Sequence, residues 1–114
     1  DTLATIRRVF ERDGYLMDPH TAVAQTVYER YAARTGDGAQ TVLLSTANPY
    51  KFATAVLSAF ETPGKDDFEN ADRLLALTGA PVPKGLTELL GRPERHLDVC
   101  DLADMQQRVI APVR

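Results

Sequence analysis

A short apolar segment, Thr41–Ser45, places the strongest constraint on the fold of this chain. Its residues are β-branched or aliphatic and do not alternate between apolar and polar, which is typical of a strand buried on both faces of a parallel sheet. One or two strands cannot form a sheet that covers several helices, because isolated two-stranded pieces are marginally stable at best. We therefore predict that this strand pairs with strands outside these 114 residues, and that the chain is a piece of a larger α/β protein.

Start and stop signals divide the rest of the chain into helices. Asp18-Pro19 combines a carboxylate N-cap with proline at the first helical position, and glycines follow the apolar periodic stretches where helices should end. Up to residue 60, the predicted elements are a helix ending at Gly14, a helix at about 19–34, the strand at 41–45, and a helix that begins at Asn48-Pro49 and carries Phe52, Val56 and Phe60. After it we predict a helix at about 68–78, a brief helix at 84–90 and a short strand at 96–100. The last predicted helix is capped by Asp101, with Asp104 in a partial capping box.

These predictions describe one mostly helical α/β segment with one or two strands. Helix, helix, strand and helix occupy about residues 1–60, and a helical tail occupies about residues 61–114. Helix–strand–helix is half of a doubly wound pattern, in which strands and helices alternate.

The charge and cysteine content exclude several classes of function. Thirteen basic and sixteen acidic residues give a formal charge of −3, and no segment concentrates basic residues, so we expect neither nucleic acid nor a membrane as a partner. Cys100 is the single cysteine, and no Cys/His cluster has the spacing of a metal site. No apolar run is long enough to cross a bilayer. We expect a cytoplasmic protein.

Ser45 and Thr46 are the first candidates for ligand binding. They follow the predicted strand and enter a turn that opens into a helix, a place where ligand sites are common in α/β proteins. Hydroxyl groups there can hydrogen-bond a ring nitrogen or a phosphate without adding a charge. The alternative is that both hydroxyls satisfy local backbone groups at a strand end.

Three charged or titratable residues near helix starts are further candidates. Asp18 and His20 could serve as acid, base or substrate contacts, or they could be an N-cap and an ordinary first-turn histidine. Lys51 lies in a first helical turn, where its charge is unfavourable, which suggests either a role for the ammonium group or a solvated side chain. The sequence contains no glycine-rich phosphate loop, no Ser-His-Asp order and no metal motif.

Two motifs, read together, resemble a known family. Residues 14–24 read GYLMDPHTAVA and residues 45–52 read STANPYKF. Together with the later region at about 82–89, they resemble the C-terminal part of threonine synthase, in the longer bacterial and fungal type of that enzyme. The resemblance covers roughly residues 14–110.

The resemblance implies an enzyme that depends on pyridoxal 5'-phosphate (PLP) and has the tryptophan-synthase-β-like fold, fold type II. Such an enzyme converts O-phospho-L-homoserine and water to L-threonine and phosphate, with the cofactor as electron sink. The lysine that forms the Schiff base and the loop that holds the cofactor phosphate lie upstream in that family. We therefore expect no catalytic lysine in this chain, no cofactor bound by this segment alone, and an inactive isolated segment whose main partner is the rest of the polypeptide.

The resemblance also assigns roles to individual residues. Thr46 matches the family position whose hydroxyl contacts the pyridine nitrogen, and Ser45 is its neighbour. Asp18 and His20 match an acidic-Pro-His segment placed near the site. Asn48 stands where many relatives have histidine, which puts a substrate or phosphate contact in doubt. The alternatives are a related fold type II PLP lyase and a non-catalytic homologue that acts as a binding module.

Overall fold

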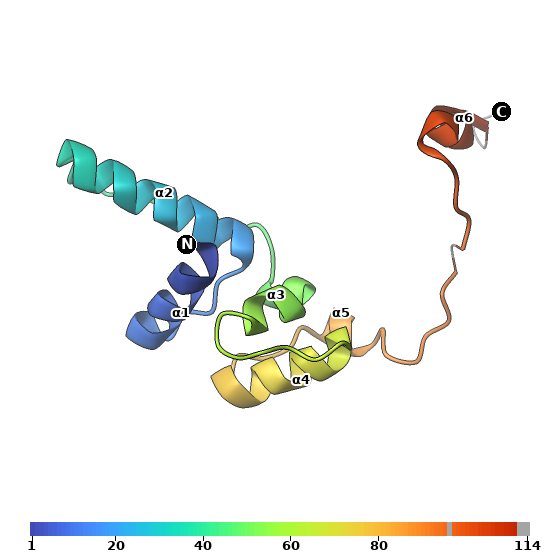
Figure 1. Cartoon of the computed structure of the whole chain (residues 1–114), viewed down its shortest axis with the longest axis horizontal. Helices are drawn as coiled ribbons and strands as arrows, with labels where there is room; N and C mark the ends of the chain where they lie inside the picture. Colours follow the sequence, from blue (N-terminus) through green and yellow to red (C-terminus); the bar gives the residue numbers. More distant parts are fainter. Residues whose placement is uncertain (96, 112–114) are drawn as a thin grey trace.

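The computed structural model describes residues 1–95 and 97–111, and within these residues every regular element is a helix (Figure 1). In chain order the elements are α1 (Thr2–Asp13), α2 (Pro19–Thr35), the 3₁₀ helix η1 (Pro49–Phe52), α3 (Ala53–Leu57), α4 (Asp67–Thr78), α5 (Lys84–Thr87), the 3₁₀ helix η2 (Leu102–Asp104) and α6 (Met105–Ile110). No helix among the described residues is long and apolar enough to span a membrane.

Helices α1 and α2 form a hairpin joined by residues 14–18. Gly14 ends α1 with φ 68°, a left-handed conformation that glycine adopts without a steric penalty. Ile6 and Val9 of α1 are buried, and the Thr5 and Thr26 hydroxyl oxygens lie 2.8 Å apart between the two helices. The predicted boundaries of both helices are confirmed, with α2 extending one residue further, to Thr35.

Helices α3 and α4 form a second pair that packs beneath α1. Val56, Leu57 and Leu74 are completely buried between them. The rings of Phe10 and Phe60 meet edge to face, with centroids 5.5 Å apart, and so connect the two helix pairs. The predicted helix at 68–78 is confirmed as α4, which begins one residue earlier and ends at Gly79.

The predicted strand at Thr41–Ser45 does not form among the described residues, whereas the mostly helical character predicted for this segment is confirmed. The segment carries no regular secondary structure, and its Val42 and Leu44 side chains are 79% and 80% exposed. A strand is defined by hydrogen bonds to a neighbouring strand, and the described residues provide none to pair with.

Other expectations need smaller corrections. The helix after Asn48-Pro49 is a 3₁₀ turn followed by five α-helical residues, so Phe60 lies beyond its end. The predicted helix at 84–90 is α-helical only over Lys84–Thr87. Asp101 precedes η2 but makes no side-chain cap hydrogen bond, so the capping box with Asp104 does not form. Residues 97–100 are not a strand, and the first residue of that prediction, at position 96, lies outside the described residues.

The C-terminal region is built differently from the rest of the chain. Every described residue from 87 to 111 is exposed. In Figure 1 this region extends away from α5 as an irregular arm that ends in α6. The packed core therefore lies within residues 1–86, where the candidate site residues also lie.

Candidate functional site

The Asp18 carboxylate is the centre of the polar cluster that the structure assembles. Asp18 is the N-cap of α2 and is completely buried. It accepts hydrogen bonds from the backbone N–H groups of His20 at 2.9 Å and Thr21 at 3.4 Å. The Thr21 hydroxyl donates to Asp18 Oδ2 at 2.5 Å. The predicted N-cap is therefore confirmed, and the carboxylate also holds side chains beyond its own turn.

Opposing effects set the pKa of the Asp18 carboxyl. Burial by itself raises this pKa, because it disfavours the charged form. Hydrogen bonds from the Thr21 hydroxyl and from the His20 and Thr21 backbone outweigh burial, and they bring the pKa below its ordinary value. Asp18 is consequently ionised near neutral pH and can only accept hydrogen bonds.

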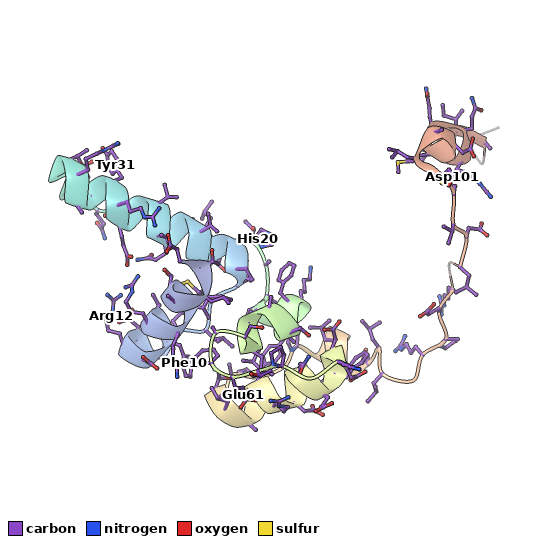
Figure 2. All side chains as sticks on the ribbon, viewed as in Figure 1. Phe10, Arg12, His20, Tyr31, Glu61 and Asp101 are labelled. Atoms are coloured by element: carbon purple, nitrogen blue, oxygen red, sulfur yellow. The ribbon has the colours of Figure 1, made fainter. Side chains whose placement is uncertain are left out.

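This ionised carboxylate determines which nitrogen of His20 carries the proton. His20 Nδ1 lies 3.0 Å from Asp18 Oδ1. Because the carboxylate has no proton to donate, Nδ1 must be the donor, and the neutral ring then has its lone pair on Nε2. The His20 side chain is 68% exposed, and its ring lies beside that of Phe52, with centroids 5.0 Å apart. Figure 2 shows His20 at the beginning of α2.

Ser45 connects the extended segment to this cluster. Its Oγ lies 3.2 Å from the Thr21 hydroxyl and 3.4 Å from Asp18 Oδ2. The Thr21 hydroxyl has one proton, which the close contact with Asp18 already uses. The Ser45 hydroxyl can donate to Asp18 Oδ2 or to the Ala47 carbonyl oxygen, which lies 3.5 Å away, so it already has acceptors within its own chain.

Thr46 differs from its neighbour because its hydroxyl remains available. Thr46 is exposed and lines an open hollow of about 730 Å³ together with Ser45 and Asn48. The other walls are the turn after α1, at 14–16, and residues 78–81 after α4. Within the described residues the Thr46 hydroxyl makes no hydrogen bond, so it can donate one to a molecule in the hollow.

Asn48 and Tyr50 shape the turn that carries these hydroxyls. Asn48 Oδ1 accepts a hydrogen bond from the Tyr50 N–H at 2.9 Å, as expected of an N-cap. The buried Tyr50 hydroxyl donates to the Ala80 carbonyl oxygen at 2.5 Å, which ties η1 to the segment after α4. The Asn48 side-chain oxygen is thus occupied by capping.

Lys51 is not brought to this hollow. It lines a separate, largely apolar groove of about 290 Å³ between η1, α4 and α5, in which Asp67 and Asp72 also lie. Its role near a substrate site stays a prediction.

Sequence reasoning missed Thr21 and Tyr50 as organising residues. A hydroxyl residue three positions after an N-cap Asp is a usable local signal for Thr21. Nothing local signals Tyr50, because its partner Ala80 is 30 residues away. The structure also brings no group of three or more His, Cys, Asp or Glu side chains together as a metal site among the residues it describes.

Comparison with known proteins gives a consistent match. The family model described as threonine synthase, C-terminal, matches residues 21–110. The human protein named threonine synthase-like 1 is 33% identical over 111 residues, which are 92% of this chain and 14% of that protein. Threonine synthase of Saccharomyces cerevisiae is 39% identical over 74 residues, 60% of this chain and 14% of the enzyme. That of Schizosaccharomyces pombe is 42% identical over 57 residues, 49% of this chain and 11% of the enzyme. The chain thus spans between about one ninth and one seventh of the length of these relatives.

Proposed function

Because this chain belongs to the threonine synthase family, through that family's C-terminal domain, we propose that it forms one wall of the cofactor site in a PLP-dependent threonine synthase. The parent enzyme would convert O-phospho-L-homoserine and water to L-threonine and phosphate, a carbon–oxygen lyase reaction on a phosphate ester. This 114-residue segment would not carry out the reaction by itself.

The observation that carries the proposal is the free hydroxyl of Thr46 at the wall of an open hollow. A pyridine nitrogen is a hydrogen-bond acceptor, so it requires a donor, and Thr46 offers one, whereas the Ser45 hydroxyl already has acceptors within its own chain. The free hydroxyl donor of Thr46 is therefore compatible with the ring nitrogen of the cofactor.

The residues would act on the bound cofactor through position and polarity. When bound, PLP supplies the electron sink for the reaction. A neutral hydroxyl at the ring nitrogen, in place of a carboxylate, leaves that nitrogen largely unprotonated. An unprotonated ring withdraws electrons from the substrate less strongly. Asp18, through Thr21 and Ser45, would hold the turn that presents Thr46.

We also propose that the main partner of this chain is the remainder of a threonine synthase polypeptide with fold type II. The extended segment 41–45 has exposed Val42 and Leu44 side chains, and its backbone is not paired with a strand among the described residues. Pairing with strands of a larger sheet would bury both side chains and satisfy the backbone. The small-molecule partner would be O-phospho-L-homoserine, and the cytoplasmic location stays a prediction.

The test is a substitution of Thr46 in the complete enzyme that carries this chain. Thr46→Val replaces the hydroxyl with a methyl of similar size, and we expect turnover to fall about tenfold or more while PLP absorbance is retained. Losing one hydrogen bond worth about 1.5 kcal/mol in the transition state has this effect. Thr46→Ser keeps the donor and is the matched control. Unchanged turnover in Thr46→Val would remove Thr46 from the site.

A second measurement concerns the segment alone. The isolated 114-residue chain should show no aldimine absorbance with PLP, whereas the complete enzyme should. Stoichiometric Schiff-base formation by the segment would contradict the placement of the catalytic lysine.

One observation favours a second candidate, a non-catalytic homologue that uses the hollow for binding. Asn48 uses its side-chain oxygen to cap the Tyr50 N–H, and the family resemblance implies a histidine at this position in the catalytic enzymes. A complete protein that binds PLP or phosphohomoserine without forming threonine would support this candidate. A related PLP lyase would instead release a different product from its own substrate.

A further inference from the structure

We propose that Tyr50 is a positioning residue of the parent enzyme, whose buried hydroxyl holds the turn at 45–50 against the segment after α4 and thereby fixes the place of the Thr46 hydroxyl. This inference rests on the proposed function, because Tyr50 would act through the contact between Thr46 and the cofactor. It goes further by assigning a share of the turnover to a hydroxyl whose own hydrogen bond stays within the chain.

Thr46 depends on neighbouring residues for its position. Its side chain is exposed, and among the described residues neither its hydroxyl nor its backbone takes part in a hydrogen bond. A donor contributes to a reaction only where it is aimed at its acceptor, because a displacement of about 1 Å can lower a rate about 100-fold. The two ends of the turn must therefore hold Thr46 in place.

The end of the turn at Ser45 is attached to the beginning of α2. Ser45 Oγ lies 3.2 Å from the Thr21 hydroxyl and 3.4 Å from Asp18 Oδ2. Both distances are longer than is usual for hydrogen bonds donated by a hydroxyl group to an oxygen. This end by itself therefore fixes the turn only loosely, and a second point of attachment is needed.

Tyr50 provides that second attachment at the other end of the turn. Its side chain is 5% exposed, and its hydroxyl donates to the Ala80 carbonyl oxygen at 2.5 Å. Burial raises the pKa of the Tyr50 hydroxyl above its ordinary value, so the group keeps its proton and remains a donor. The Tyr50 backbone N–H in turn donates to Asn48 Oδ1 at 2.9 Å, which stiffens the turn between Thr46 and this attachment.

The acceptor of the Tyr50 hydroxyl belongs to another wall of the hollow. Residues 78–81, which include Ala80, line the hollow together with Thr46. They follow directly after α4, whose Leu74 is completely buried in the core. The Tyr50 hydroxyl therefore ties the wall that carries Thr46 to the packed part of the molecule, and its removal would let that wall shift.

The first variant is Tyr50→Phe in the complete PLP enzyme that carries this chain. Phenylalanine retains the buried ring and removes only the hydroxyl. We expect kcat to fall about fivefold, the effect of losing one ordinary hydrogen bond, while KM and the amount of bound PLP stay nearly unchanged. Tyr31→Phe is the matched control, because it removes an exposed tyrosine hydroxyl that contacts Asp37 at 3.0 Å and does not line the hollow. Its kcat should equal that of the wild type.

A double-mutant cycle shows whether Tyr50 acts through Thr46. In the Thr46→Val enzyme the hydroxyl that Tyr50 positions is already absent, so adding Tyr50→Phe should lower kcat by less than about twofold. A merely structural contribution of Tyr50 would lower kcat by the same factor in both backgrounds. Equal factors would overturn the inference.

A conservative replacement tests the hydrogen bond itself. At position 50, 4-aminophenylalanine has nearly the shape of tyrosine and keeps an N–H donor for the Ala80 carbonyl oxygen, so kcat should stay within about twofold of the wild type. A loss as large as that expected for Tyr50→Phe, with this donor in place, would overturn the inference. This result can be read even if Tyr50→Phe fails to fold.

The outcomes separate this inference from the proposed function. Unchanged turnover in Thr46→Val contradicts the proposed function. A Thr46→Val enzyme with reduced turnover, together with a Tyr50→Phe enzyme of normal kcat, contradicts only the role of Tyr50. A loss of kcat in Tyr50→Phe accompanied by an equal loss of bound PLP would indicate a structural role and would also overturn the inference.

Discussion

Two completely buried polar side chains, Asp18 and Asn70, serve different purposes in this molecule. Asn70 lies in α4, where its Oδ1 accepts from the Gly64 N–H at 2.7 Å. Its Nδ2 donates to the Gly64 carbonyl oxygen at 3.1 Å and to the Thr54 hydroxyl at 2.8 Å. Every partner belongs to the packed interior of the α3–α4 pair or to the loop that joins these helices. The amide closes that loop, and through the Thr54 hydroxyl its network continues to Asp67, which lines the apolar groove between η1, α4 and α5.

The Asp18 carboxylate also has its hydrogen bonds satisfied, but its network reaches the surface of the molecule. Its hydrogen bonds continue through His20 to an exposed ring and through Ser45 to the hollow that Thr46 lines. Both clusters avoid the cost of an unpaired buried polar group. The comparison shows that burial alone does not distinguish a structural polar residue from a functional one. The two networks differ in the surface that they reach, which is an exposed imidazole and the hollow lined by Thr46 for Asp18, and the groove lined by Asp67 for Asn70.

The largest effect should come from placing a charge in the closed cluster. Asn70→Asp conserves size but removes both amide donors, and the Thr54 proton is already donated to Asp67. A buried carboxylate that keeps only the Gly64 N–H as a donor should lower the free energy of unfolding by about 3 kcal/mol or more. Urea denaturation of the chain, followed by circular dichroism, measures this. A loss under 1 kcal/mol would show that water enters the cluster.

The reverse exchange, Asp18→Asn, should lower the free energy of unfolding by less than Asn70→Asp does. Asp18→Asn removes a charge that accepts several hydrogen bonds but retains a good N-cap residue. We expect a loss of about 2 kcal/mol, because the charge-assisted bonds from Thr21 and His20 weaken. The same urea titration compares it directly with Asn70→Asp. A larger loss than in Asn70→Asp would invert the ranking of the two clusters.

The two clusters should also differ in their response to pH. The pKa of Asp18 is lowered in the folded chain, so its contribution is fully present above its unfolded pKa of about 3.9. That contribution is lost as the pH falls through the lower folded value. The stability difference between wild type and Asp18→Asn should therefore be constant above pH 5 and shrink below pH 4. The contribution of Asn70, tested as Asn70→Ala, should not change over that range.

The smallest effect is expected at the open end of the Asp18 cluster. His20→Gln alters a mostly exposed side chain, and the stability change should stay within about 0.5 kcal/mol. Thermal unfolding of the chain measures it. A loss above 1.5 kcal/mol would show that the ring contributes to packing against Phe52, and it would weaken the functional interpretation of this cluster.

Much of the fold could be predicted because helix boundaries are coded locally. Asp18-Pro19 and the glycines at 14, 36 and 79 act within one turn of the chain, so their effects are readable from neighbouring residues. The strand at 41–45 could not be judged this way, because its formation depends on a partner strand. Val23 and Val27 likewise lie one helical turn apart in α2, a spacing typical of a buried face, yet both side chains are about half exposed.

In the candidate site, too, local sequence signals predicted some features, whereas others depend on contacts between distant residues. The N-cap role of Asp18 was readable from its position before proline. The contacts of Ser45 with Asp18 and Thr21 join residues at least 24 positions apart, and no local pattern specifies them. The separation of Lys51 from the hollow likewise depends on how α4 and α5 pack around η1.

By itself, the sequence determined where helices start and stop and which short motifs carry hydroxyl, carboxylate and imidazole groups, since backbone capping acts over a few residues. Only the tertiary structure decided that the Asp18 carboxylate ties His20 to Ser45, and that Thr46 keeps a free donor beside them. Those outcomes depend on how distant segments approach one another and on which acceptor each hydroxyl proton has already reached.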